Sequence, residues 1–177
     1  MARIRFEKGT VQVFTGNGKG KTTAALGCGL RAAGHGFKIL MIQFMKGRRY
    51  GELDAVKNVP GFDILQFGRD SFVKKGNLCT EDIELARRGL DKAHEAISSG
   101  AYDMVILDEV NVAVDHGLLP LEEILELIRE KPNHVELILT GRYAHKRIRD
   151  AAHLVTEMVE TKHHFAAGIG AREGIEY

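Results

Sequence analysis

The chain has 177 residues, the length of one ordinary domain, and 44% of them are hydrophobic and 28% charged. It contains no apolar run near the roughly 18 residues that a membrane-spanning helix requires, so we expect no membrane span. The 25 Lys and Arg nearly balance the 24 Asp and Glu, and the net charge of +1 gives no global field to hold nucleic acid or an anionic membrane. Any anionic ligand must be held locally.

The two cysteines, Cys28 and Cys79, form no Cys-x-x-Cys pair. Residues 1–13 lack the apolar stretch of a secretory signal, and together these features predict a reducing, cytoplasmic location. No segment has the composition of a linker between domains. We therefore expect residues 1–177 to form a single α/β domain.

Apolar runs of strand length alternate with helical patterns along the whole chain. The expected strands cover residues 10–14, 37–45, 62–67, 103–107, 135–140 and 153–162. The expected helices cover residues 21–33, 80–97, 120–128 and 145–152. Residues 46–60 are polar and interrupted by glycine, and residues 68–77 are expected to form a loop, a candidate lid. Because strands apolar on both faces alternate with helices, we predict a three-layer α/β fold with a mostly parallel central sheet.

The strongest local signal is TGNGKGKTT at residues 15–23, between the first expected strand and the first expected helix. Its Gly20-Lys21-Thr22 segment matches the end of a phosphate-binding loop. Glycines let backbone N–H groups turn toward phosphate oxygens, Lys21 adds a charge, and the Thr22 hydroxyl can bind Mg²⁺. The usual motif has glycine where this chain has Thr15. The alternative, a plain glycine-rich turn, leaves the lysine-threonine pair without a role, so we predict nucleotide binding.

Two adjacent carboxylates, Asp108 and Glu109, follow the apolar strand MVIL. A Mg²⁺ bound by Thr22 would need anionic partners at this edge of the sheet. Without the upstream loop, the pair has an alternative interpretation, in which an acid at the end of a buried strand only caps the following turn. The motifs alone allow ATP hydrolysis, phosphoryl transfer or another reaction of a Mg-triphosphate.

Arg142 follows the next buried strand and is a candidate contact for phosphate or for the transition state. A surface arginine paired with a neighbouring acid is an equally good interpretation. The eight histidines are scattered, and they do not predict a metal site.

Nearly the whole chain resembles the corrinoid adenosyltransferases of the CobA/CobO/BtuR type. The resemblance rests on the segments VFTGNGKGKTTAALG, RAAGHG, QFMKG, VILDE, LLPLEE, TGRYAH and KHHFAAGIGAREGIEY. That family is similar to RecA-type ATPases but lays the triphosphate along the loop in the reverse direction. The resemblance therefore implies a three-layer RecA-like P-loop fold.

The implied reaction transfers the 5′-deoxyadenosyl group of ATP to cobalt(I) of a corrinoid and releases tripolyphosphate, in adenosylcobalamin biosynthesis or salvage. Cobalt(I) is itself the nucleophile, so the resemblance implies no protein base. Catalysis then comes from positioning two substrates and neutralising the leaving triphosphate. The implied catalytic residues are Lys21, Glu109 and Arg142.

The same resemblance implies the other site residues. It assigns the triphosphate to Asn17, Gly18, Lys19, Gly20, Lys21, Thr22 and Thr23. It assigns the metal, Mg²⁺ or Mn²⁺, to Thr22, Glu109 and Asp108, and it places Arg31 close to the nucleotide.

Two departures from the family pattern concern the corrinoid. Family members often carry a longer N-terminal segment over it, whereas only residues 1–9 precede the first strand here, so we expect another element or a partner subunit to cover that face. The family also shields the lower axial position of cobalt with bulky aromatics from the loop after the third strand. Phe72 is the aromatic residue of loop 69–73 and the candidate for this role.

The resemblance further implies a homodimer and a flavoprotein-type electron donor, with no nucleic-acid or membrane partner. Two alternatives to the transferase stay open on the residues alone. One is a RecA-like P-loop ATPase with Glu109 as the base that activates water, and the other is a non-catalytic ATP-responsive binding module. The products made from ATP would distinguish all three.

Overall fold

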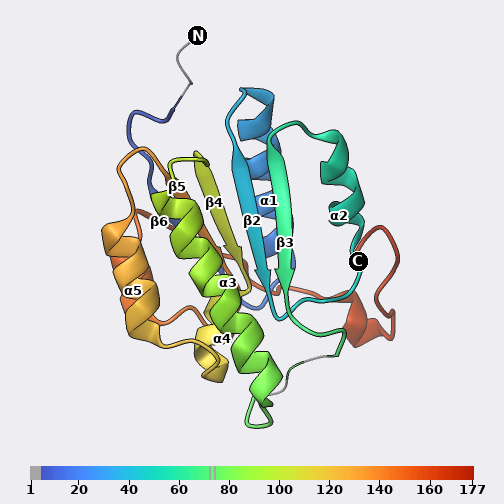
Figure 1. Cartoon of the computed structure of the whole chain (residues 1–177). Coiled ribbons are helices and arrows are strands. Elements are labelled where there is room, and N and C mark those ends of the chain that lie inside the picture. Colours follow the sequence, from blue (N-terminus) through green and yellow to red (C-terminus); the bar gives the residue numbers. More distant parts are fainter. Residues whose placement is uncertain (1–4, 72, 74) are drawn as a thin grey trace.

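The structure is a computed structural model that describes residues 5–71, 73 and 75–177. Within this part of the chain, six strands form one sheet with the order β3-β2-β4-β5-β1-β6, and every neighbouring pair is parallel (Figure 1). The strands are β1 (Val11–Thr15), β2 (Ile39–Phe44), β3 (Phe62–Phe67), β4 (Met104–Asp108), β5 (Glu136–Thr140) and β6 (Leu154–Glu157). The helices are α1 (Lys21–Gly34), α2 (Gly51–Ala55), α3 (Thr80–Ser98), α4 (Val110–His116), α5 (Leu121–Glu130) and α6 (Lys146–Ala151). Two short 3-10 helices are η1 (Val56–Asn58) and η2 (His164–Ala167).

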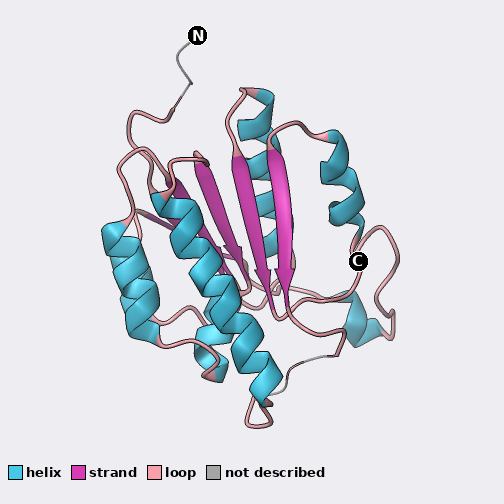
Figure 2. Ribbon diagram, in the orientation of Figure 1, coloured by secondary structure: helices cyan, strands magenta, loops and turns pink. Residues whose placement is uncertain are grey.

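Helices cover both faces of the sheet, so the molecule has three layers (Figure 2). α3, α4, α5 and α6 pack on one face, where Leu40 and Ile42 of β2 point. α1 packs on the other face, where Ile39 and Met41 of the same strand point. Both sets of β2 side chains are fully buried, which explains the continuous apolar run in the sequence. The predicted three-layer α/β architecture is confirmed, and the sheet is wholly rather than mostly parallel.

Four parallel strands deliver their carboxyl ends to one edge of the sheet. The glycine-rich loop follows β1, Lys46 follows β2, Glu109 follows β4 and Arg142 follows β5. Ligands of open α/β sheets bind at this edge, because the loops there come from different strands and converge. The fold therefore brings together residues that are far apart in the sequence.

Three segments differ from the sequence-based expectation. Residues 46–60, for which the polar, glycine-interrupted sequence predicted no helix or strand, contain α2 and η1. α4 begins directly after Glu109 and was not predicted. The last strand, predicted over residues 153–162, covers only Leu154–Glu157, because beyond it the chain turns across the glycine-rich loop instead of extending the sheet.

None of the helices in the described residues is both long enough and apolar enough to cross a bilayer.

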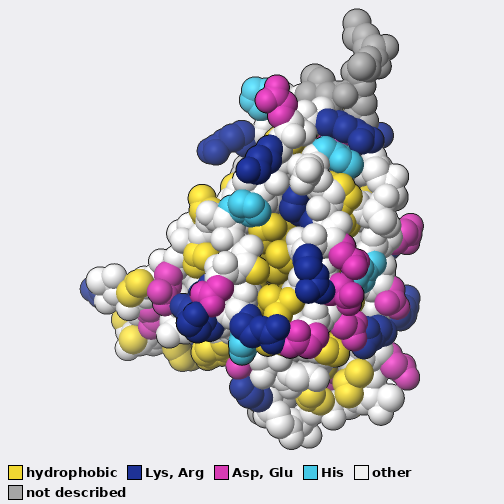
Figure 3. All heavy atoms as spheres, turned by 90° about the vertical axis from the view of Figure 1, so that its left-hand side faces the viewer, with side chains coloured by type: hydrophobic (Ala, Val, Ile, Leu, Met, Phe, Trp, Pro, Cys, Tyr) yellow, Lys and Arg dark blue, Asp and Glu magenta, His cyan; other side chains and the backbone are white. Residues whose placement is uncertain are grey.

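Figure 3 turns the left-hand side of Figure 1 toward the viewer, and charged side chains of both signs are mixed there with hydrophobic ones. β6 is the edge strand beside β1, and its Leu154 and Val155 are about half exposed, at 45% and 42%.

Candidate functional site

The glycine-rich loop wraps around the ammonium of Lys21. Lys21 Nζ donates hydrogen bonds to the carbonyl oxygens of Gly16, at 2.8 Å, and Gly18, at 2.7 Å. Gly20 precedes α1 with a φ of 116°, a left-handed conformation that favours glycine. Burial lowers the pKa of Lys21; Glu109 opposes this effect and Arg142 adds to it. The loop is thus folded as a cradle at the N-terminus of a helix, where backbone N–H groups and the helix dipole favour an anion.

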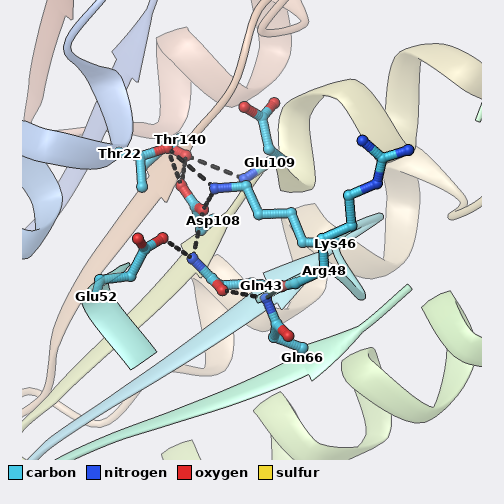
Figure 4. A network of polar contacts seen from close by, with 9 residues as sticks. All are labelled: Thr22, Gln43, Lys46, Arg48, Glu52, Gln66, Asp108, Glu109 and Thr140. Atoms are coloured by element: carbon cyan, nitrogen blue, oxygen red, sulfur yellow. Dashed lines mark hydrogen bonds and ion pairs between the residues drawn. The ribbon is translucent and has the colours of Figure 1, made fainter. Parts of the chain in front are cut away.

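Asp108, at the end of β4, is the centre of a buried polar network (Figure 4). Its Oδ1 accepts hydrogen bonds from Thr22 Oγ1, at 2.9 Å, and Thr140 Oγ1, at 2.7 Å. Its Oδ2 accepts from Lys46 Nζ, at 2.7 Å, and Gln43 Nε2, at 3.3 Å. A fully buried carboxylate is costly unless it is paired and hydrogen-bonded, and these four donors supply both conditions. The network also fixes the Thr22 hydroxyl at the mouth of the loop.

The network continues away from the loop through two glutamines. Gln43 Nε2 also donates to Glu52 Oε1 of α2, at 3.0 Å. Gln66 Nε2 donates to Gln43 Oε1 and to the carbonyl oxygen of Arg48, both at 3.0 Å. These bonds connect β2, β3 and α2, so the unpredicted helix α2 is tied to the Asp108 carboxylate.

Glu109 lies beside this network in a special backbone conformation. Its φ is 63°, uncommon for a residue other than glycine, and its N–H donates to Thr140 Oγ1 at 3.0 Å. Burial and the neighbouring Asp108 raise the pKa of Glu109 above its ordinary value, against the opposing charges of Lys46, Lys21 and Arg142. Backbone strain of this kind collects at functional sites.

The loop, Lys46, Glu109 and Arg142 line a cavity of about 490 Å³. Residues 174–177 of the C-terminal tail line its other side. Lys19 Nζ lies 2.6 Å from Glu176 Oε1 and 3.1 Å from the carbonyl oxygen of Ile175. Hydrogen bonds from Arg172 and Lys19 hold the pKa of Glu176 well below its usual range. The tail therefore places a carboxylate against the phosphate-binding loop.

The hydroxyl at the start of α1 and the carboxylates at the end of β4 are oxygen ligands of the kind that Mg²⁺ takes when it also binds phosphates. Mg²⁺ usually takes one or two carboxylates together with substrate phosphates and water rather than a cage made by protein alone. No group of three or more His, Cys, Asp or Glu in the described residues could hold a metal ion by itself. Thr22, Asp108 and Glu109 are the oxygen donors that would hold it.

Most of the predicted site residues converge. The residues that line the cavity include Gly18, Lys19, Gly20, Lys21, Thr22, Thr23, Glu109 and Arg142. Asp108 lies directly behind them, bonded to Thr22. Asn17 is exposed in the loop and is not part of this lining.

One predicted residue lies away from the cavity, and another lies outside the described residues. Arg31 is exposed in the last turn of α1, about 15 Å along the helix from Lys21 at 1.5 Å per residue. Its role near the nucleotide stays a prediction. Phe72 lies outside the described residues, so its shielding role also stays a prediction.

The structure adds residues that the motifs did not single out. Lys46, Tyr50 and Glu52 line the cavity from the segment after β2, and Gly174–Tyr177 line it from the tail. A lysine directly after a buried strand, at the edge where the other polar residues gather, is a signal that could have identified Lys46. The tail carries no such local signal, because 157 residues separate Lys19 from Glu176.

Comparison with known proteins shows the family. A family model described as ATP:corrinoid adenosyltransferase BtuR/CobO/CobP matches residues 7–177. The chain belongs to this family. It is 37% identical to the corrinoid adenosyltransferase of Escherichia coli (strain K12), over 100% of this chain and 90% of that protein. It is 36% identical to corrinoid adenosyltransferase CobA of Salmonella typhimurium (strain LT2), with the same coverage of both chains. The resemblance inferred from the motifs is confirmed.

Among solved structures, the fold is similar to a KaiC-like protein from the archaeon Pyrococcus horikoshii, with a TM-score of 0.54 and 18% identity. The match covers 86% of this chain and 74% of that one. A similarity at this level of identity concerns the fold alone. It confirms the RecA-like P-loop architecture of this member of the adenosyltransferase family.

Proposed function

We propose that this chain transfers the 5′-deoxyadenosyl group of ATP to the cobalt(I) of a corrinoid and releases tripolyphosphate. The observation that carries the proposal is the family match across residues 7–177, which includes every element around the cavity. The cavity supplies the chemistry of a triphosphate site: a glycine-rich loop, a helix N-terminus and four cationic side chains, those of Lys19, Lys21, Lys46 and Arg142.

In this reaction the protein stabilises a leaving group. Cobalt(I) donates an electron pair to C5′ of the ribose as the cobalt–carbon bond forms, and the C5′–O bond breaks with its electrons going to tripolyphosphate. Cobalt thereby changes formally from +1 to +3. As the C5′–O bond breaks, negative charge develops on its oxygen, which leaves as part of the triphosphate. Cations placed beside the triphosphate therefore act more strongly in the transition state than in the ground state.

The chain's own residues perform this stabilisation. Backbone N–H groups of residues 17–22 and the ammonium of Lys21 would face the phosphate oxygens once Lys21 exchanges its bonds to the Gly16 and Gly18 carbonyls for bonds to phosphate. Arg142 lines the same cavity and adds a second cation. A magnesium ion held by Thr22, Asp108 and Glu109 would supply further charge neutralisation and orient the phosphates.

Product analysis tests the proposal. Wild-type protein, MgATP and a chemically reduced cobalt(I) corrinoid should yield tripolyphosphate, which phosphorus NMR distinguishes from ADP and phosphate. ADP and phosphate would support the ATPase alternative with Glu109 as base, and unchanged ATP would support the binding module.

The resemblance extends the proposal to the setting of the enzyme. We infer a homodimer that receives electrons from a flavoprotein-type donor in the cytoplasm. The thiols of Cys28 and Cys79 are both free, which is compatible with a reducing compartment. Sedimentation analysis of the purified protein tests the dimer, and reduction of bound cobalt(II) by added flavoproteins tests the donor.

A further inference from the structure

Lys46 is held in the site by unusual backbone features. Met45, which precedes it, has a φ of 60°, so the chain turns sharply after β2. A Cβ on Gly68 would lie 2.3 Å from the backbone nitrogen of Lys46, and a Cβ on Gly47 would lie 2.4 Å from the carbonyl oxygen of Gly68. The two backbone segments therefore touch as only glycines allow. The strained turn and the close packing fix the origin of the Lys46 side chain at the edge of the sheet.

The ammonium of Lys46 lies between two groups that would hold a metal ion. Lys46 Nζ is 2.7 Å from Asp108 Oδ2 and 3.5 Å from Thr22 Oγ1. Figure 4 shows its side chain reaching across to Asp108 from the loop after β2. The side chain is only 14% exposed and passes over the ring of Tyr50, with Nζ 5.1 Å from the ring centre. The chain thus supplies its own cation to this carboxylate.

Acidic side chains surround the ammonium of Lys46. Burial lowers the pKa of Lys46, but the charge and hydrogen bond of Asp108, together with the charges of Glu109 and Glu52, raise it above its ordinary value. Lys19, Lys21 and Arg142 are the other Lys and Arg residues that line the cavity. The ion pair of 2.7 Å between Lys46 Nζ and Asp108 Oδ2 therefore neutralises this buried carboxylate.

A divalent cation that used Asp108 and Thr22 would compete with this ammonium for the same oxygens, and two cations that close repel each other. The flexible stem of Lys46 lines the same cavity as residues 18–23 of the loop, so an ammonium released from Asp108 can reach a bound triphosphate. We propose that Lys46 is a positioning residue that neutralises Asp108 while the site has no nucleotide, and that it transfers to the triphosphate when a metal–triphosphate complex binds. This inference rests on the proposed triphosphate site.

The proposal makes two opposite predictions for one variant. In Lys46→Gln, nucleotide-free protein should bind Mn²⁺ about tenfold more tightly than wild type, because the competing charge is gone. The same variant should bind MgATP about tenfold more weakly, because a charge-assisted contact to phosphate is lost. Electron paramagnetic resonance of free Mn²⁺ measures the first affinity, and calorimetry measures the second. The matched control is Lys57→Gln, a surface lysine paired with Asp54, which should change neither affinity.

Several results would overturn the proposal. Unchanged or weaker Mn²⁺ binding by folded Lys46→Gln would show that Lys46 does not compete for the metal position. Unchanged MgATP binding would show that it does not move to the triphosphate. If Lys46→Gln does not fold, Lys46→Arg provides the test: it keeps the charge and should exclude free Mn²⁺ as wild type does, and tight Mn²⁺ binding by it would contradict the proposal. A failure of the proposed function would appear instead as missing adenosyl transfer by wild type, which these titrations do not measure.

Discussion

Thr22 at the start of α1 and Asp108 at the end of β4 are joined by a hydrogen bond of 2.9 Å between Thr22 Oγ1 and Asp108 Oδ1, across 86 residues of sequence. This bond connects the loop that cradles phosphate to the strand that carries the acids. It places one hydroxyl and one carboxylate where a metal bound to phosphate would need them.

The Asp108 carboxylate should contribute to stability as well as to metal binding. The Asp108 carboxylate accepts four hydrogen bonds, and the neutral amide of Asp108→Asn cannot neutralise Lys46. Breaking a buried ion pair typically lowers the free energy of unfolding by about 3–5 kcal/mol. Urea unfolding should show this loss. Asp115→Asn is the control, because Asp115 pairs with Lys75 at the surface and should contribute less than about 1 kcal/mol. Equal losses in both variants would contradict the central role of Asp108.

Replacement of Lys21 should weaken ATP binding and turnover together. Lys21→Ala removes charge-assisted hydrogen bonds to phosphate worth about 1.5–3 kcal/mol, or roughly ten- to a hundredfold. Calorimetry with MgATP and single-turnover assays measure the two effects. Near-wild-type affinity and turnover would show that Lys21 and the glycine-rich loop do not hold the triphosphate.

Glu109→Gln should stabilise the metal-free fold while it weakens metal binding. Because the folded-state pKa of Glu109 is raised by burial and Asp108, its ionised form costs stability at neutral pH. The melting temperature of the variant at pH 7 should therefore exceed that of wild type, by about 2–4 °C for each kcal/mol gained in the free energy of unfolding. This advantage should shrink as the pH falls through the raised pKa and vanish below the ordinary glutamate value, where both side chains are neutral.

The metal measurement on the same variant is independent of its stability. The Mg²⁺ concentration that half-saturates activity should rise about tenfold or more in Glu109→Gln. If the metal titrations of the variant and wild type overlay, Glu109 has a structural role only.

The tail carboxylate should compete with the triphosphate for Lys19. Glu176→Gln removes a partly exposed ion pair, worth about 0.2–1 kcal/mol, so MgATP should bind up to about fivefold more tightly. Glu173→Gln, an exposed acid three residues earlier in the tail, should leave the affinity unchanged. Weaker MgATP binding by Glu176→Gln would show that the tail contacts the nucleotide favourably instead.

The sequence predicts the parts of this site that depend on local pattern and parallel topology. The strand before Thr15, the helix after Gly20 and the apolar strand before Asp108 have clear periodicity, and parallel strands bring their carboxyl ends to one edge. These facts place Thr22 and Asp108 at the same end of the sheet, and their contact depends in addition on the strand order, in which only β5 separates β1 from β4.

The remaining parts depend on contacts that local pattern does not record. α2 has five residues and α4 has seven, too few turns to show a reliable periodicity. Lys46 reaches Asp108 because Met45 adopts a positive φ, which no residue preference predicts. The tail returns to the loop through Glu176, a contact that only the folded chain brings about.

Formation of the cobalt–carbon bond and release of tripolyphosphate can be followed in a single assay. Wild-type protein is incubated with MgATP and chemically reduced cobalt(I) corrinoid, and the absorption spectrum is followed while tripolyphosphate is quantified. We expect the spectral change of a new cobalt–carbon bond together with about one tripolyphosphate per corrinoid converted, and much slower conversion by Lys21→Ala. An unchanged corrinoid spectrum with ATP intact, or with ADP and phosphate formed, would contradict it.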